Sequence, residues 1–371
     1  MKYLKIIGYF LCSIYLGHLP CLAQNDTLPR VMKNDTSISK IGVLPAAFYA
    51  PETRFGFGGF VYAYFKASKA TVACKKSNAQ SYFSYTINKQ FSIENDYQIW
   101  LKRNKFYFTG GLDYQRYPEY FYGISNNSKE HDKIMISFDL FKIRSKNLIQ
   151  IKKYFYAGIF YQFEKLYNLN MKLKEPMAQL CELIPGGNGY SASGIGPILI
   201  YDQRDNPLNP AKGGYFETSF QYFDKSIGSG YNFKSFIFDA RKYNVLFEKV
   251  IWNGNLYAHL NNGQVPYRML ATIGGARFLR GYYKGRFRGN NMVILQQELR
   301  MPIYKWFGIA AFGGLGSVAK QVKEFSKNEI HHNFGVGLRL RINKKENTNI
   351  RLDYGVTKDS QGLYFIFAEA F

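Results

Sequence analysis

The sequence predicts an all-β fold, namely a transmembrane antiparallel β-barrel of 16 strands that is reached by an exported chain. Three observations lead to this class: an N-terminal export signal, an apolar and polar alternation with a period of two, and an aromatic content of 18% in 371 residues. Tyr and Phe favour strands and also membrane–water boundaries. The composition therefore suits strands whose two faces meet different solvents.

Residues 1–23 have the features of a signal peptide. Lys2 and Lys5 supply the positive start, residues 6–19 form a mostly apolar core, and cleavage is expected after Ala23. The core is too short for a membrane-spanning helix, and no other apolar run approaches the required length. We expect residues 24–50 to be a short periplasmic segment and residues 51–371 to form the barrel.

The period of two is clearest near the C-terminus. In residues 334–342, for example, apolar side chains alternate with glycine and arginine. Fully charged residues lie in mid-strand on the second face of such segments, as at Glu298, Arg339 and Asp353. This repeated pattern is typical of outer-membrane barrels, whose apolar faces meet lipid and whose polar faces line the lumen.

The alternation and the intervening turn residues define fifteen candidate strands: 55–65, 79–88, 90–101, 105–116, 133–145, 150–165, 193–204, 214–224, 231–246, 250–262, 291–302, 306–318, 332–343, 348–356 and 361–371. Asn104 and Asn147 mark two of the short breaks. Termini on one side of the membrane require an even number of strands. The sixteenth strand is 38–49, which contains Pro45, or 166–176, and we favour the second because 166–192 would otherwise be a very long loop. We place most of the long breaks outside the cell.

The net charge of +23 comes from Lys and Arg spread along the whole chain. The spread disfavours nucleic-acid binding and favours a basic lumen or contact with phosphorylated lipids. Cys74 and Cys181 follow the signal, and whether they pair stays open. No Cys/His spacing indicates a metal site or cofactor, and no histidine has the spacing of a catalytic triad, so no enzyme activity is expected.

Three stretches in order carry a resemblance to a known family. Residues 201–215 resemble its yD-x-RDN-x-x-x-P-x-x-G-x-Y segment through Asp202, Arg204, Asp205, Asn206, Pro210 and Gly213. The tetrapeptide Leu279, Arg280, Gly281 and Tyr282 resembles the family's VRGF/Y motif, and residues 297–302 resemble its n-x-E-x-R-x-P strand. Phe371 ends the chain like a C-terminal insertion signal. The sequence is thus similar to the BamA/TamA superfamily of outer-membrane assembly barrels, also called the bacterial surface antigen family.

The resemblance implies 16 strands, five of them after a loop that folds into the barrel from outside with the VRGF/Y motif at its tip. It also implies an ion pair between Arg280 and the aspartate of an F-x-D-x-G strand motif. Gly314 stands at that aspartate's position here. In the strand alternation, Glu298 and Asp353 occupy positions whose side chains face the lumen, so we predict that Arg280 contacts one of them.

The family's insertion and export proteins carry POTRA domains before the barrel, and the segment ahead of residue 51 is too short for one. We therefore expect a monomeric, barrel-only member in the bacterial outer membrane. It would aid insertion, assembly or translocation of outer-membrane components. The partners would be outer-membrane lipids, protein clients, or a periplasmic or surface protein. The alternative is a passive, anion-preferring pore or a membrane scaffold for a partner protein.

Overall fold

The computed structural model describes residues 38–50, 54–65, 75, 77–171, 184–207, 209–247, 249–343, 348–367 and 369–371. These residues belong to one structural unit, Thr36–Phe371. The expected signal peptide and the pair Cys74 and Cys181 lie outside the described residues. No helix in the described ranges is long and apolar enough to cross a membrane.

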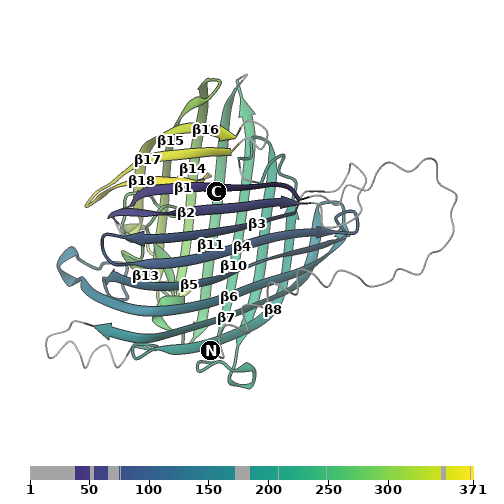
Figure 1. The fold of residues 1–371 in the computed structure, drawn as a ribbon. Coiled ribbons are helices and arrows are strands. Elements are labelled where there is room, and N and C mark those ends of the chain that lie inside the picture. Colours follow the sequence, from purple (N-terminus) through teal and green to yellow (C-terminus); the bar gives the residue numbers. More distant parts are fainter. Residues whose placement is uncertain are drawn as a thin grey trace, which may run out of the picture. The chain divides into compact units, whose positions relative to one another are not determined.

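Sixteen strands form a single antiparallel sheet in chain order, as the sequence predicts (Figure 1). The first eight are β1 (Ile38–Ala50), β2 (Arg54–Phe65), β3 (Ser77–Thr86), β4 (Phe91–Leu101), β5 (Phe106–Phe121), β6 (Ile134–Lys152), β7 (Phe155–Met171) and β8 (Tyr190–Asp202). The others are β9 (Gly213–Phe223), β10 (Phe233–Leu246), β11 (Val250–Gly263), β14 (Asn291–Tyr304), β15 (Phe307–Ala319), β16 (His331–Asn343), β17 (Thr348–Thr357) and β18 (Gln361–Phe367).

The connection after β11 contains a separate small hairpin, β12 (Ala271–Ile273) and β13 (Phe287–Gly289). Five strands of the large sheet follow this connection, which confirms the expected number. Short 3-10 turns complete the loops: η1 (Glu130–Asp132), η2 (Lys225–Ile227), η3 (Tyr267–Met269), η4 (Val322–Glu324) and η5 (Lys327–Glu329).

Alternate connections of an antiparallel sheet lie at the same end of its strands. The connections 102–105, 153–154 and 305–306 are short and share one end with both termini of the sheet. The long connections 122–133, 264–290 and 320–330 share the opposite end. Outer-membrane barrels have short periplasmic turns and longer extracellular loops, and we assign the two ends accordingly. Tyr304 and Trp306 are more than half exposed at the short-turn end, where an aromatic girdle is expected.

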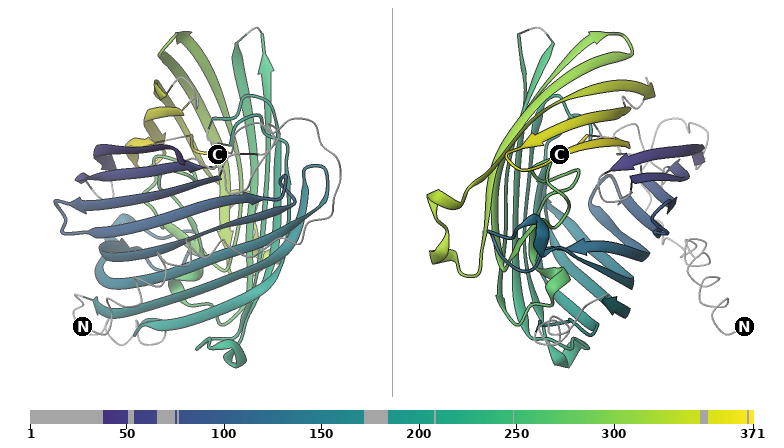
Figure 2. Two further views of the ribbon diagram at one scale, coloured as in Figure 1. Left: turned by 45° about the vertical axis from the view of Figure 1, so that its right-hand side comes forward. Right: turned by 90° about the vertical axis from the view of Figure 1, so that its left-hand side faces the viewer.

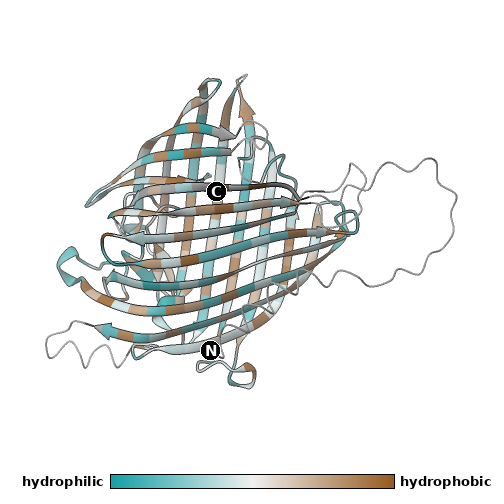
Figure 3. Cartoon of the chain, viewed as in Figure 1, coloured by the Kyte–Doolittle hydropathy of each residue, from teal (hydrophilic) through white to brown (hydrophobic). Residues whose placement is uncertain are grey.

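The two faces of the strands differ as the sequence predicts. In β16, Phe334 and Val336 are 66% and 61% exposed on the outer face, whereas Asn333 and Arg339 on the inner face are 1% and 4% exposed. Apolar and polar residues alternate in this way along the strands (Figure 3). Apolar side chains thus meet lipid, and charged ones line the lumen.

Ion pairs join side chains of different strands on the inner face of the sheet. Lys142 pairs with Glu164 at 3.1 Å, Arg144 with Asp113 at 3.0 Å, and Lys146 with Glu217 at 2.6 Å. Each of these cations therefore meets an acid inside the lumen, where an unpaired charge would be costly.

The sixteenth strand is β1, so the expectation that 166–176 forms it is wrong. Residues 166–171 instead continue β7, where Leu166 pairs with Leu140 of β6 and Met171 pairs with Ile136. Pro45 does not prevent β1 from forming, because β1 is an edge strand that, within the described ranges, forms a ladder with β2 alone. The sheet accordingly begins at Ile38 rather than at residue 51.

Two further expected boundaries are also wrong. Asn147 lies inside β6, and the turn falls at Lys153 and Tyr154, which takes a left-handed φ of 69°. The backbone of Asn147 stays in register with both neighbouring strands, and its exposed side chain donates to Ser145 Oγ at 3.1 Å. A polar residue on the outer face therefore need not interrupt a strand. Strand β5 likewise continues to Phe121, beyond the expected end at residue 116.

The sheet curls until its two edges, β1 and β18, approach each other (Figure 2). Within the described ranges no ladder of backbone hydrogen bonds joins them. We call this line of approach the seam. β18 has 7 residues and β1 has 13, so the two edges are unequal in length.

Candidate functional site: an in-folded loop and its buried ion cluster

The connection 264–290, which we call the motif loop, folds into the lumen and turns back on itself. Gly274 has a φ of 111° and bonds through its N–H to Phe278 O at 3.0 Å. A Cβ at Gly274 would lie 1.9 Å from Tyr283 O, so only glycine fits there. The next residues form the tip, where Leu279 is fully buried and takes a left-handed φ of 49°. The glycines of the motif thus permit the tight path that their spacing suggests.

Arg280 at the tip is 1% exposed and contacts both acids that parity places in the lumen. Its Nη1 donates to Asp353 Oδ2 at 2.5 Å, and its Nη2 donates to Glu298 Oε2 at 2.7 Å. The ring centroid of Phe312 lies 3.4 Å from the guanidinium carbon, which adds a cation–π contact. The planar guanidinium donates in-plane hydrogen bonds to two carboxylates while its flat face stacks on an aromatic ring, a fixed geometry that the point charge of an ammonium group does not provide.

Four more charged groups extend this contact into a buried cluster. Arg339 donates to Asp353 at 2.6 Å and to Glu369 at 2.8 Å, and lies 3.3 Å from Glu298. Arg351 donates to Asp353, and Arg300 lies 3.4 Å from Glu298. The ion cluster is Arg280, Glu298, Arg300, Arg339, Arg351, Asp353 and Glu369, with four cations and three anions. The one excess positive charge of the cluster is shared among several guanidinium groups rather than carried by one unpaired arginine.

Backbone contacts tie the same tip to the last strands. Tyr364 of β18 accepts from Gly281 N–H at 3.1 Å and donates to Tyr282 O at 3.1 Å. Asn333 of β16 donates to Arg280 O at 2.8 Å. A Cβ at Gly355 of β17 would lie 2.4 Å from Arg280 O, so the loop and the wall meet backbone to backbone. The motif is therefore bonded directly to the edge strand at the seam.

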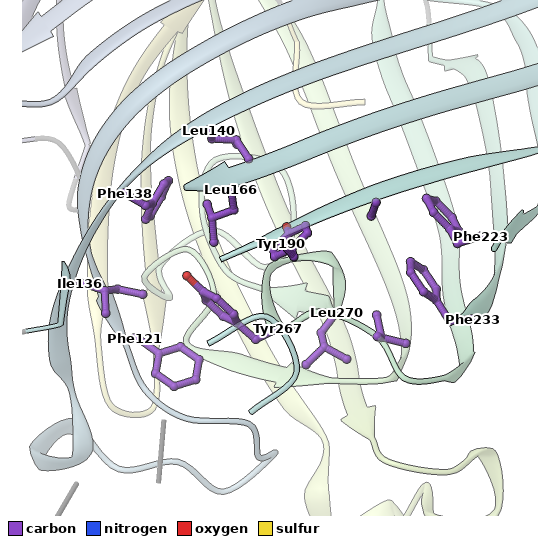
Figure 4. Close-up of a cluster of buried hydrophobic side chains, with 12 residues drawn as sticks. Phe121, Ile136, Phe138, Leu140, Leu166, Tyr190, Phe223, Phe233, Tyr267 and Leu270 are labelled. Carbon is purple, nitrogen blue, oxygen red and sulfur yellow. The ribbon is translucent and has the colours of Figure 1, made fainter. Parts of the chain in front are cut away.

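The opposite wall holds the base of the motif loop. Tyr267 and Leu270 join a buried apolar cluster from β5 to β10 (Figure 4), together with Phe121, Ile136, Phe138, Leu140, Leu166, Tyr190, Ala192, Phe223, Phe233 and Val265. Arg268 forms an ion pair with Glu119 of β5, and Arg288 donates to Tyr267 O at 2.6 Å. Burial raises the pKa of Tyr267 and lowers the pKa of Arg288. The loop is thus fixed to both sides of the lumen.

The structure accounts for the missing aspartate of the F-x-D-x-G motif. A Cβ at Gly314 would lie 2.8 Å from Leu279 Cδ2 and 3.0 Å from Gln296 Cγ, so the loop itself fills the space. The acidic partners lie instead on β14, as Glu298, and on β17, as Asp353. Arg280 was predicted to contact one of these acids, and it contacts both.

The predicted turn segment lies at the periplasmic end. The Arg204 guanidinium donates two hydrogen bonds to the Asp202 carboxylate, at 2.9 and 3.1 Å. Asp205 Oδ1 accepts from the backbone N–H groups of Asn206, Ala211 and Lys212. Gly213 takes a φ of 103°, and Pro210 is buried. These contacts shape the turn.

Asn209, which sequence reasoning did not single out, connects this turn to the ion cluster. Its Oδ1 accepts from Arg300 Nη1 at 2.6 Å. Sequence reasoning also missed Arg300, Arg339, Arg351 and Glu369 as members of the cluster. Their signal was present, because mid-strand charges with lumen parity must find partners inside a narrow barrel.

Phe371 is 7% exposed but lies beyond the end of β18, so the expectation of a strand to residue 371 is wrong. The strand ends at Phe367, and Glu369 turns its carboxylate to Arg339 and to Asn349, which donates at 2.9 Å. The ion pair with Arg339 thus holds the segment after β18 against the buried cluster. The role of Phe371 as an insertion signal stays a prediction. In the described part of the chain, no group of three or more His, Cys, Asp or Glu residues is arranged to hold a metal ion.

Comparison with known proteins shows the family of the chain. The Omp85 superfamily domain matches residues 48–371. No curated protein matches the sequence significantly. Solved structures with the same fold include BamA from Haemophilus ducreyi lacking POTRA domains 1–3, with TM-score 0.57, 12% identity, and coverage of 88% of this chain and 70% of that one.

Two CdiB structures are also similar. CdiB from Acinetobacter baumannii has a TM-score of 0.56 at 10% identity and covers 89% of this chain and 65% of its own. CdiB from Escherichia coli has a TM-score of 0.57 at 10% identity, with coverages of 90% and 68%. The fold, the motif order and the domain match agree: the chain belongs to the Omp85 superfamily and is a β-barrel of the bacterial outer membrane.

Proposed function

We propose that this barrel aids the insertion, assembly or translocation of outer-membrane components through its seam. A client strand or lipid would enter between β1 and β18, where exposed backbone groups offer hydrogen bonds to an incoming strand. The approach of the two edges without a ladder in the described ranges supports this proposal. It assigns no catalytic residue.

One observation carries the proposal: the tip of the motif loop is bonded to Tyr364 on the edge strand β18. A motion of the loop would therefore be transmitted to the seam through a direct contact. Glu369 adds a second link, because it joins the segment after β18 to Arg339 in the ion cluster. The loop and cluster would act as a support that sets the position of β18.

A crosslinking experiment tests the seam. Cysteine pairs, one on β1 and one on β18, are introduced after Cys74 and Cys181 are changed to Ser. The purified chain is placed in liposomes with a urea-unfolded eight-stranded barrel as the client. We expect faster client folding than in empty liposomes, loss of this gain on oxidation, and recovery on reduction.

The control pair lies across the continuous β9–β10 ladder, at Thr218→Cys and Phe238→Cys, which face each other in register. Oxidation of this pair should leave client folding unchanged. If the oxidised seam pair folds the client as fast as the reduced one, the seam is not the route.

The alternative, a passive anion-preferring pore or a scaffold for a partner protein, has less support. The motif loop occupies the lumen, and lumenal cations such as Lys142, Arg144 and Lys146 are paired with acids. We expect only small conductance in planar bilayers. A large, steady, anion-selective current would favour the pore instead.

A further inference from the structure

A groove of about 620 Å³ opens on the outer side of the barrel wall, at the extracellular end of β9, β10, β11 and β14. The connection 320–330, between β15 and β16, forms its far side, and Figure 2 shows this light green segment standing off the sheet. The volume lies in the range of small-molecule sites, which is enough for the headgroup of a lipid. The motif loop lies on the other face of this wall, where Ile273 and Leu279 pack with Tyr257 of β11 and Ile294 of β14.

The floor of the groove is apolar. Phe220, Phe236 and Leu260 belong to the outward-facing rows of β9, β10 and β11, and Phe220 is 41% exposed. Val322 of the connection, 59% exposed, faces the same space. An acyl chain would meet hydrocarbon along this surface.

The rim of the groove is basic. Lys234, Lys320 and Lys323 line it and are exposed, and none of the three forms a salt bridge with another described residue. The nearby acid Glu324 accepts a hydrogen bond from Gln321 N–H at 3.1 Å within its own turn. Asn262 and Asn290 add amide groups that suit hydroxyl ligands.

The positive groups come from two sides of the groove. Lys234 lies on β10, whereas Lys320 and Lys323 follow β15, and β11 and β14 lie between them. Three strand spacings separate the two backbones by roughly 14 Å. A glycerophospholipid with one phosphate cannot occupy both sides, but a disaccharide with a phosphate at each end can.

We propose that this groove binds a bis-phosphorylated, multiply acylated disaccharide lipid of the outer leaflet. The two phosphates meet the lysines on opposite sides, the sugar hydroxyls meet the asparagines, and the acyl chains lie on the aromatic floor. The position agrees with the sidedness of the barrel, since the groove is at the long-loop end and faces lipid.

Native mass spectrometry of the full chain in detergent tests the proposal, with purified diphosphoryl lipid A as the probe. Monophosphoryl lipid A and phosphatidylglycerol serve as comparison lipids. The diphosphoryl form should bind at least about fivefold more tightly than either, since each lysine–headgroup contact is worth a factor of about five. Changing Lys234, Lys320 and Lys323 to Gln should raise the Kd on the order of 100-fold.

The matched control changes Lys89, Lys129 and Lys358 to Gln, which removes the same charge from exposed positions on the extracellular side that belong to connections other than 320–330. Its Kd should stay within about twofold of the unchanged protein. Heat-modifiable migration on gels shows that each variant is folded. Equal binding of phosphatidylglycerol, equal losses in the two triple variants, or no binding of diphosphoryl lipid A by the folded protein would each overturn the proposal.

Discussion

Removal of the Arg280 side chain should release the tip of the motif loop from the wall. In Arg280→Ala, Glu298 and Asp353 lose the donors at 2.7 and 2.5 Å, and Phe312 loses its cation–π partner. Both carboxylates lie in the lumen with almost no exposure to solvent, so water cannot replace the lost donors. The hydrogen bonds of the loop backbone with the side chains of Tyr364 and Asn333 remain and resist the release.

The cost follows from the remaining contacts. Breaking a buried ion pair by removing one partner typically costs about 3–5 kcal/mol. Arg339 still contacts both acids, at 3.3 and 2.6 Å, which reduces the uncompensated charge. The lost cation–π contact adds about 1 kcal/mol. We therefore expect loop anchoring to weaken by about 3 kcal/mol, which raises the population of the released loop roughly 100-fold.

Hydrogen–deuterium exchange of the barrel in detergent measures this population directly. Amides in 271–289 should exchange roughly 100-fold faster in Arg280→Ala, whereas amides of β9 and β10 should not change. Arg280→Lys keeps the charge but not the planar guanidinium, so its exchange rate in 271–289 should lie between those of Arg280→Ala and the unchanged protein.

Arg277→Ala is the matched control on the same loop. The Arg277 side chain is 46% exposed and pairs with Asp239 at 3.0 Å, so its removal should cost less than about 1 kcal/mol. Equal exchange in Arg280→Ala and the unchanged protein would refute the anchoring role. So would an effect of Arg277→Ala as large as that of Arg280→Ala.

Three further substitutions test the packing around the tip. Gly355→Ala places a Cβ 2.4 Å from Arg280 O and should lower the free energy of unfolding in urea by about 1–3 kcal/mol. The control Gly214→Ala, whose added Cβ has its nearest atom at 3.5 Å, should change that free energy little, and equal costs would contradict the close approach. Gly314→Asp introduces the aspartate expected from the family motif, yet it should lower the free energy of unfolding by about 1–3 kcal/mol because Leu279 fills the space of the new side chain. A gain in stability against urea would show that the loop can move to accommodate the aspartate. Glu369→Gln weakens the bond to Arg339 and should make the C-terminus more accessible to carboxypeptidase. The control Glu329→Gln, at an exposed position, should not change digestion. Unchanged digestion of Glu369→Gln would argue against the link between Glu369 and Arg339.

The strand pattern was predictable because it depends on a local property. Successive side chains of a strand point to opposite faces, so two solvents imprint a period of two on the sequence. The predicted outward row of β16, with Phe334 and Val336, is exposed in the structure, and Arg339 is buried. The errors at Asn147 and at residues 166–171 arose where the partner strand, rather than the local residues, decides the length.

The motif loop shows where local reasoning ends. Parity placed Glu298 and Asp353 in the lumen, and Gly314 marked the absent acid, so the partners of Arg280 could be named in advance. Parity did not show that one arginine would contact both acids, or that Phe312 would stack on it. The two contacts with acids join positions 18 and 73 residues apart in the chain.

By itself, then, the sequence determined the class of fold, the inward and outward faces, the order of the motifs and the family. Each of these depends on alternation or on short segments, which the chain carries locally. Only the tertiary structure decided that β1 completes the sheet, that Glu369 leaves the last strand for the ion cluster, and that Tyr364 joins the motif to the seam. Those features depend on which distant strands meet across the lumen, and the curling of the sheet brings them together.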